Sequence, residues 1–253
     1  MLRTRVIPCL LLRGGGLYKT VKFKDPKYVG DPINAVRIFN EKEVDEILVL
    51  DIGATSERRE PNFELIRDIA SECFMPLAYG GGITDLGQMR RLQRIGVEKV
   101  AINSAAFRNP DLVRSACDAL ATSSVVAAID VKRSFFGKYE VWIDGGRTNT
   151  KADPVQHAVN LAKLGVGEIL INNIDRDGTM SGYDVALIKK IAESVDTPVI
   201  ACGGAGSLDH IQEVTQKGHV EAAAAGSLFV FHGRHRAVLI NYPSQQELEA
   251  LLD

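Results

Sequence analysis

Tyr79-Gly80-Gly81-Gly82 and Ala201-Cys202-Gly203-Gly204 are glycine-rich stretches that end apolar runs at matching places in the two halves of this 253-residue chain. Around these stretches the two halves align without a gap at an offset of 122 residues, which matches Gly82 to Gly204. Near the start of each half the offset is 119 residues. Further matched positions are Glu46 with Glu168, Gly96 with Gly218 and Ser104 with Gly226. The sequence therefore predicts two copies of one structural unit.

Eight apolar runs recur without polar alternation, which is typical of parallel strands buried on both faces. They cover 5–11, 46–51, 76–80, 98–103, 124–130, 168–173, 198–202 and 220–225. Helical patterns fill the gaps and begin with a capping residue or a first-turn proline at Asp31-Pro32, Pro61-Asn62, Asp85, Asn109-Pro110, Asp153-Pro154 and Ser207. This alternation predicts an α/β fold, a (βα)8 TIM barrel forming a single domain, 1–253, with half-barrels at about 1–122 and 123–253.

The composition excludes several classes of function. A net charge of −2 gives no basic footprint for nucleic acid. Four scattered cysteines form no CxxC pair, so we expect neither a zinc site nor a disulfide framework, and a reducing cytoplasm fits best. The start of the chain lacks the apolar region and cleavage site of a signal peptide, and no apolar run reaches membrane-spanning length. Nothing in the residues indicates a metal or another cofactor.

The glycine-rich strand ends indicate phosphate binding, because loops after the last two strands of such barrels often bind phosphate through backbone N–H groups. We call Gly203, Gly204, Gly226 and Ser227 the second grip, and their repeat counterparts Gly81, Gly82, Asn103 and Ser104 the first grip. Alternatively, the glycines only allow tight turns. Because both grips occur, we expect a phosphorylated small molecule that spans the mouth of the barrel with a phosphate at each end.

Carboxylates at strand ends are candidates for proton transfer to a bound ligand. Asp51 and Asp130 each end a predicted strand, and Asp177 follows another. A lone aspartate in such a place often only caps a helix or binds an arginine. Asp130 is more informative, since its repeat counterpart is Leu11. A reaction that needs an acid and a base on opposite sides of the substrate would lack one of them.

Charged residues mark the other end of the predicted barrel. Arg5, Glu46, Lys99 and Glu168 lie at the starts of four strands with alternating sign. A closed ring of ion pairs across the barrel floor would satisfy all four, because an unpaired buried charge costs several kcal/mol. From the residues alone, a rim of solvated charges is the favoured interpretation.

Two connections, 12–30 and 131–152, are longer than the others, and long loops in compact domains are often lids. We interpret 13–19 as a candidate mobile flap, and Tyr139 and Trp142 as parts of a small hairpin that covers the site. Cys9 and Cys202 are interpreted as small core residues, since no histidine is placed near either of them.

These motifs resemble the cyclase subunit of imidazole glycerol phosphate synthase over nearly the whole chain. The residues that carry the resemblance are 5–10 (RVIPCL), 79–83 (YGGGI), 102–106 (INSAA), 175–179 (DRDGT) and 202–206 (CGGAG). In that family, ammonia from a separate glutaminase subunit enters through the barrel floor and reacts at the mouth with a bisphosphorylated ribulosyl substrate, which is cyclised and cleaved.

The resemblance implies a role for each candidate residue. It makes Arg5, Glu46, Lys99 and Glu168 the ammonia gate, assigns phosphate to both grips with Lys19 as a further contact, makes Asp130 a central acid/base, and places Asp51 and Asp177 around the substrate. The departures are Leu11 in place of the second central aspartate, Ala101 in place of a serine and Asn172 in place of a threonine.

A branch of this family found with surface-polysaccharide enzymes looks like this chain at Leu11 and at 229–233 (FVFHG). Its members are thought to work with a glutaminase-like subunit and an ATP-dependent sugar amidotransferase that converts an acetamido group to an acetamidino group. The leading hypothesis is therefore an ammonia-channelling barrel subunit of such a system. Two alternatives remain open: a working cyclase of histidine biosynthesis, and a non-conducting activator of a glutaminase.

Overall fold

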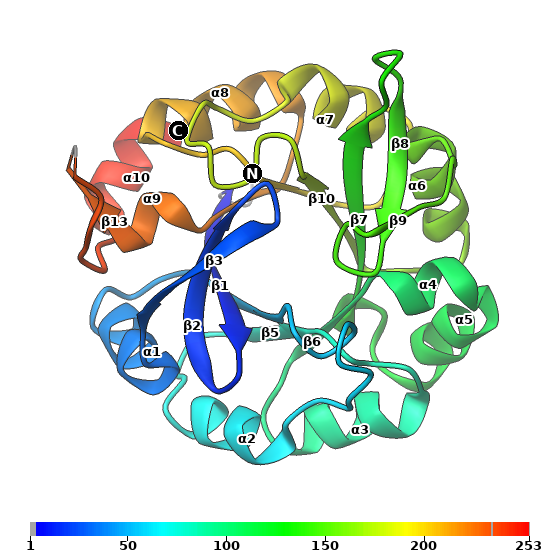
Figure 1. Ribbon diagram of the computed structural model, residues 1–253, viewed down its shortest axis with the longest axis horizontal. Coiled ribbons are helices and arrows are strands. Elements are labelled where there is room, and N and C mark those ends of the chain that lie inside the picture. The colour runs from blue at the N-terminus through cyan, green and yellow to red at the C-terminus, as the bar shows by residue number, and fades with distance from the viewer. Residues whose placement is uncertain (1–3, 234, 253) are drawn as a thin grey trace.

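Eight parallel strands form a closed barrel in the computed structural model, which describes residues 4–233 and 235–252 (Figure 1). Its strands, in barrel order, are β1 (Arg5–Arg13), β4 (Ile47–Asp51), β5 (Leu77–Gly80), β6 (Lys99–Ile102), β7 (Val125–Arg133), β10 (Glu168–Asn173), β11 (Val199–Cys202) and β12 (Ala222–Ala225). The pairing of β10 with β7, and of β1 with both β12 and β4, completes the circle. The predicted barrel and its eight strands are confirmed.

Helices surround the barrel in the described part of the chain. The ring consists of α1 (Pro32–Glu41), α2 (Phe63–Ser71), α3 (Leu86–Arg94), α4 (Ser104–Arg108), α5 (Pro110–Ala119), α6 (Pro154–Lys163), α7 (Val185–Ala192), α8 (Leu208–Gly218), α9 (Ser227–Val230) and α10 (Gln245–Leu252), with a 3₁₀ turn at Thr122–Ser124. None of the described helices is long and apolar enough to cross a membrane.

The predicted helix starts are correct because their side chains satisfy backbone N–H groups that a first turn leaves free. Each capping side chain accepts a hydrogen bond from the residue three positions ahead, at Asp31, Asn62, Asp85, Asn109, Asp153 and Ser207. Proline follows three of these caps, where its missing N–H costs nothing. Local hydrogen bonding therefore fixes the residue at which each of these helices begins.

The apolar core has two parts. The larger one lies between the strands and the helices and includes Phe39, Ile66 and Leu92. The smaller one fills the inside of the barrel with residues from every strand, among them Ile7, Leu48 and Val126. Inward and outward side chains alternate along a strand, so each strand contributes to both parts.

The two long connections are mostly regular strand rather than loop. After a turn at Gly14 and Gly15, β2 (Gly16–Val21) returns antiparallel to β1 and pairs with β3 (Lys24–Gly30). The interpretation of 12–30 as a long loop is therefore wrong, because β1 simply continues beyond the barrel and gains an antiparallel partner. Motion of 13–19 stays a prediction.

The second connection contains the predicted hairpin. β8 (Tyr139–Ile143) pairs antiparallel with the extended end of β7, so that Trp142 lies opposite Asp130, and β9 (Thr148–Asn149) pairs with β8. Figure 1 shows this ribbon rising from the barrel at β7 and β8. Two short strands near the C-terminus, β13 (Phe231–His232) and β14 (Ala237–Val238), form a separate ribbon.

Truncation of Phe39 tests the outer core. Its side chain is fully buried, so Phe39→Ala removes its packing and leaves a cavity, with an expected loss of about 3–5 kcal/mol in the free energy of unfolding. Phe74→Ala is the matched control, since Phe74 is 88% exposed, and we expect a change below about 0.5 kcal/mol. Urea titration followed by circular dichroism measures both. Equal losses would contradict this description of the core.

Candidate functional site

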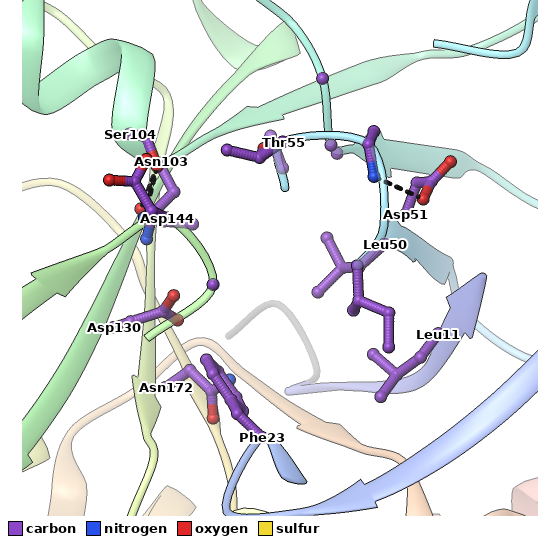
Figure 2. A pocket seen from close by; sticks show the side chains of 18 of the residues that line it. Leu11, Phe23, Leu50, Asp51, Thr55, Asn103, Ser104, Asp130, Asp144 and Asn172 are labelled. Atoms are coloured by element: carbon purple, nitrogen blue, oxygen red, sulfur yellow. Dashed lines mark hydrogen bonds between the residues drawn. The ribbon is translucent and has the colours of Figure 1, made fainter. Parts of the chain in front are cut away.

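A cavity of about 1320 Å³ opens at the carboxyl ends of the barrel strands. Figure 2 shows part of it, with Leu11 and Leu50 on one side and Asp130 and Asn172 on the other. All the candidate residues of both grips line this cavity, together with Lys19 and the three candidate aspartates. The structure therefore brings the predicted mouth residues into one site, and it places the four floor charges at the opposite end of the strands.

The first grip is shaped by two glycines that adopt positive φ angles. A Cβ atom on Gly81 would lie 2.4 Å from the Asp51 carbonyl oxygen, and one on Gly82 would lie 2.7 Å from the Arg59 carbonyl oxygen. Only glycine fits here, and the backbone is exposed to the cavity as a result. Ser104 Oγ already accepts a hydrogen bond of 2.9 Å from the Asp144 N–H, so Asp144 borders this grip.

The second grip has the same form and also contains a cation. A Cβ atom on Gly204 would lie 2.2 Å from the Gly182 carbonyl oxygen, and one on Gly226 would lie 2.2 Å from Lys19 Nζ. Lys19 Nζ donates a hydrogen bond to the Cys9 carbonyl oxygen. The lysine that β2 carries over the mouth is thus adjacent to the glycines of this grip, as an anion contact requires.

Asp130 and Asp177 have properties suited to proton exchange near neutral pH. Burial, with a smaller contribution from Asp177, raises the pKa of Asp130 to about 7. Burial also raises the pKa of Asp177 to about 6, although the Lys19 ammonium and a hydrogen bond from Thr20 oppose this shift. A carboxyl group that titrates near the working pH can act as an acid or as a base.

Asp51 has a different environment. Its Oδ1 accepts hydrogen bonds of 3.0 Å from the N–H groups of Gly53 and Ala54, and Arg59 binds both carboxylate oxygens at 2.8 Å. This pattern is the capping and arginine-binding role that the sequence left open for a lone aspartate. Its carboxylate holds the loop after β4 beside the first grip.

The two half-barrels give the mouth two different walls. Leu11 on β1 repeats as Asp130 on β7, and Leu50 on β4 repeats as Asn172 on β10. Asn172 and Asp130 are in-register neighbours on adjacent strands, as are Leu50 and Leu11. At this level one wall is therefore apolar and the opposite wall is polar, so Asp130 has no carboxyl counterpart at the repeat position across the cavity.

At the floor, the four charged side chains form a closed ring, which we call the floor ring. Arg5 donates hydrogen bonds to both Glu46 and Glu168. Lys99 Nζ lies 2.7 Å from Glu46 Oε2 and 2.8 Å from Glu168 Oε2. Both glutamates are buried, so the interpretation as a solvated rim is wrong. Strand tilt directs all four side chains inward, where only mutual pairing offsets their desolvation.

Sequence reasoning did not find Arg59, Asp144 or Arg108. Arg108 forms a salt bridge with Asp144, whose own N–H binds Ser104. These residues lie on loops and at a helix end, where no repeat or periodicity marks them. The described residues contain no group of three or more metal-ligating side chains placed to hold a metal ion.

Residues 5–236 match the family model described as "Histidine biosynthesis protein". The chain belongs to this family. Similar proteins within it include "Putative imidazole glycerol phosphate synthase subunit hisF2" of Pseudomonas aeruginosa, which is 54% identical over 98% of this chain and 99% of its own length. A protein of Leptospira borgpetersenii, "Putative imidazole glycerol phosphate synthase subunit HisF", is 50% identical over 99% of both chains.

A further relative within the histidine biosynthesis family is "Imidazole glycerol phosphate synthase subunit HisF" of Bacillus cereus, 44% identical over 90% of this chain and 91% of its own length. The similarity spans both half-barrels in every case. The resemblance to cyclase subunits of imidazole glycerol phosphate synthase, first drawn from motifs, thus extends to whole relatives.

Replacement of Asp130 by asparagine tests its raised pKa. The folded-state pKa of about 7 exceeds the value of roughly 3.9 for an unfolded aspartate. Stability from this group is therefore full below pH 4 and is lost as the pH rises through 7. Asp130→Asn removes this loss. We therefore expect the free energy of unfolding of the variant, relative to that of the original chain, to rise by about 1–3 kcal/mol from pH 4 to pH 8.

Urea titrations at several pH values measure this difference. Asp111→Asn is the control, because it removes a carboxylate of the same kind from a side chain that is 90% exposed, and we expect it to change the stability much less than Asp130→Asn. A constant difference between the Asp130→Asn variant and the original chain across this range would refute the raised pKa.

Proposed function

We propose that this chain is the barrel subunit of a glutamine-dependent synthase: it receives ammonia from a separate glutaminase subunit through the floor ring and delivers it to a phosphorylated ligand at the mouth. The observation that carries this proposal is the closed floor ring beneath an apolar barrel interior. The relatives named as subunits of imidazole glycerol phosphate synthase support the pairing with a glutaminase.

The barrel interior between ring and mouth suits neutral ammonia. Its walls consist of small and apolar side chains such as Ala78, Leu48 and Ala222. Ammonium would need several kcal/mol of desolvation to enter this interior, whereas ammonia is neutral. Displacement of Lys99 from its two glutamates would open the ring. The ring then acts as a gate that excludes water and ions while the glutaminase is idle.

At the mouth, the ligand is held by its phosphates in the two grips, with Lys19 at the second grip and Asp130 and Asp177 as acid/base groups. Asp51 positions the loop beside the first grip. Loss of a general acid/base typically lowers a rate by about 10²- to 10⁴-fold, so Leu11 weakens the cyclase reaction of the family.

The finer part of the proposal concerns the acceptor of the ammonia. We assign this chain to the branch that serves an ATP-dependent sugar amidotransferase, which makes an acetamidino group on a sugar for surface polysaccharide. Leu11 and the retained floor ring support this assignment together, since the chain keeps the means of delivery and lacks half of the cyclase machinery. The cytoplasm, where the sugar donors of such pathways are made, is the proposed location, and the four free cysteines fit it.

A working cyclase of histidine biosynthesis is the second candidate. It is favoured by the pKa values of about 7 for Asp130 and about 6 for Asp177, because these two carboxyl groups can share the proton transfers without an acid/base residue at position 11. The identity of 44% to the Bacillus cereus HisF also favours it.

Turnover of the family's bisphosphorylated ribulosyl substrate with ammonium salts separates the two candidates. We expect no measurable turnover by the original chain, and turnover about 10²-fold or more above the detection limit in Leu11→Asp, because the new carboxylate faces Asp130 across the cavity. Leu50→Asp is the matched control: it places a carboxylate on the same wall at a position that is not the counterpart of Asp130, and it should stay inactive. Robust turnover by the original chain would instead favour the working cyclase.

Lys99→Met tests conduction through the floor ring. With the glutaminase partner present, we expect formation of the aminated product from glutamine to fall about tenfold or more relative to glutamine hydrolysis. Formation of the same product from added ammonium salt should be unchanged, because ammonium enters at the mouth. Lys163→Met, on the exposed side of α6, is the control. Unchanged coupling in Lys99→Met would support a non-conducting activator of a glutaminase.

A further inference from the structure

The turn that joins β7 to β8 carries two phenylalanine side chains that the proposed function does not use. Phe135 is 98% exposed and Phe136 is 93% exposed. Their rings pack edge to face, with the centroids 5.6 Å apart. A single exposed apolar side chain is common on protein surfaces, whereas adjacent exposed rings form a patch that indicates a binding surface. We call residues 134–137 the aromatic tip.

The geometry of the turn holds both rings in solvent. The Gly137 N–H donates a hydrogen bond of 2.9 Å to the Ser134 carbonyl oxygen, so Phe135 and Phe136 occupy the two central positions of a β-turn. These positions usually carry proline, asparagine, aspartate, serine or glycine. Two phenylalanines there oppose the local preference and gain no burial within this chain. Their benefit therefore comes from contact with something outside it.

The repeat shows that the barrel does not need this tip. Leu11 lies opposite Tyr18 in the hairpin of the first half. Its counterpart Asp130 lies opposite Trp142 in the second half. Seven positions separate the first pair and twelve separate the second, so the second hairpin is five residues longer. The aromatic tip is thus an addition to a scaffold whose other half folds without it.

Side-chain contacts hold the base of this ribbon in place. Tyr139 donates a hydrogen bond to Asp184, the N-cap of α7, and the Arg133 guanidinium lies over the Tyr139 ring. The Arg133 N–H donates a hydrogen bond of 2.9 Å to Asp175 Oδ2. β7 leaves the barrel at the mouth, and Figure 1 shows the end of the ribbon at the outer edge of the molecule. The tip is therefore a braced projection on the mouth side.

The segment that holds the tip carries positive charge only. Lys132, Arg133 and Lys138 flank the two rings, and no carboxylate side chain occurs between them. Lys138 is exposed, and Lys132 Nζ lies 4.8 Å from the centroid of the Trp142 ring. Arg133 is turned toward Asp184, with 3.9 Å between Nη2 and Oδ2, so the two lysines are left to meet a ligand. A surface that receives this tip has to be apolar inside and anionic at its edge.

Area and charge decide among the three kinds of surface that could bind the tip. A second copy of this chain, meeting tip to tip, would bring the lysines of both copies together. A stable protein interface usually buries about 800 Å² on each partner, whereas two phenylalanine side chains supply about 300–500 Å². An anionic lipid bilayer needs no matching pocket, since its interior is a fluid apolar solvent and its headgroups attract lysine. A bilayer therefore fits the tip best.

We propose that the aromatic tip docks this protein on an anionic membrane surface, with the rings of Phe135 and Phe136 below the headgroups. Lys132 and Lys138 then lie at the level of the lipid phosphates. Phenylalanine suits this place because it has no polar group that would lose a hydrogen bond in lipid. The binding is peripheral and reversible, because two rings and two lysines are far less than a membrane-spanning segment provides.

The backbone of the tip is suited to insertion as well. The Ser134 N–H donates a hydrogen bond of 2.7 Å to the Lys138 carbonyl oxygen, and the Gly137 N–H donates one to the Ser134 carbonyl oxygen. The Lys138 N–H donates a hydrogen bond of 3.2 Å to Ser134 Oγ. Backbone groups that leave water for lipid have to be satisfied within the protein. These three amides already meet that requirement.

Docking through the tip gives the barrel a defined orientation. The tip extends from the mouth end of β7, and the floor ring lies at the opposite end of the barrel strands. A docked molecule therefore turns its mouth side toward the lipid and keeps its floor open to solution. Only this consequence rests on the proposed function: a glutaminase then approaches the floor from solution, and ammonia emerges near the membrane surface.

Co-sedimentation with lipid vesicles tests the docking on the purified full chain. The probe is vesicles of phosphatidylglycerol and phosphatidylcholine in equal parts. We expect Phe135→Ser/Phe136→Ser to bind them about tenfold or more weakly than the original chain. Phe74→Ser is the matched control and should bind like the original chain, because Phe74 is 88% exposed but precedes β5 at the floor end. No binding by the original chain, or equal binding by the double variant, would overturn the proposal.

The contribution of charge is tested with Lys138→Gln. We expect about fivefold weaker binding to the mixed vesicles, and weaker binding by the original chain as the salt concentration rises. Lys163→Gln, at an exposed position on α6, is the matched control. Vesicles of phosphatidylcholine alone should bind the original chain much less than the mixed vesicles do. Equal binding to both kinds of vesicle would refute the role of the lysines.

Insertion of the rings is measured with Phe136→Trp. The emission of the added indole should shift to shorter wavelength on the mixed vesicles, and brominated acyl chains should quench it. The original chain is the control, since its one tryptophan, Trp142, lies in β8 opposite Asp130 and not in the turn. Absence of quenching in the Phe136→Trp variant would show that the rings stay outside the lipid and would overturn the proposal.

A protein contact through the tip is the competing outcome. Without vesicles, the Phe135→Ser/Phe136→Ser variant should keep product formation from glutamine with the glutaminase partner, because the tip is remote from the floor ring. Loss of that activity together with unchanged vesicle binding would assign the tip to a protein partner instead. The vesicle assays need neither ammonia, nor a glutaminase, nor a ligand at the mouth, so their result is independent of the proposed function.

Discussion

Closure of the parallel sheet, completed where β7 pairs with β10, is the constraint on which the rest of the structure depends. It leaves the barrel strands without a free edge and divides their side chains strictly into those that face the helices and those that face the interior. Every charge or thiol placed on an inward position must then be satisfied within a narrow lumen. The floor ring, the apolar interior and the two walls of the mouth all follow from this division.

The sequence repeat makes the two grips similar to each other. At the inward-facing positions that lie between the grips, the two half-barrels carry different residues, so the symmetry is lost there. Both grips keep glycines whose Cβ atoms would clash with the backbone, so the backbone shape of both proposed anion sites is kept. Between the grips, Leu11 faces the side of Asp130, and Leu50 faces that of Asn172. In the proposed function, this duplicated scaffold holds its ligand at both ends while Asp130 has no carboxyl counterpart across the cavity, which separates delivery of ammonia from cyclisation.

Burial decides the behaviour of the polar groups inside the barrel. At the floor it makes the four charges depend on one another, so that removing any one leaves an unpaired charge in the lumen. At the mouth it raises the pKa values of Asp130 and Asp177 into the range where they exchange protons. The same low-polarity interior therefore underlies both the floor ring and the raised pKa values at the mouth.

The sequence by itself determined the barrel, its eight strands, six helix starts and the membership of both grips, because these depend on local hydrophobic pattern, capping and a repeat that can be read along the chain. It also placed Leu11 opposite Asp130, since that comparison uses only the offset of 119. Tertiary structure alone decided that the floor charges close into a ring, that Arg59 binds Asp51, and that 12–30 is strand rather than loop. These features depend on strand tilt, stagger and burial, which join residues far apart in the chain and leave no periodic signal in it.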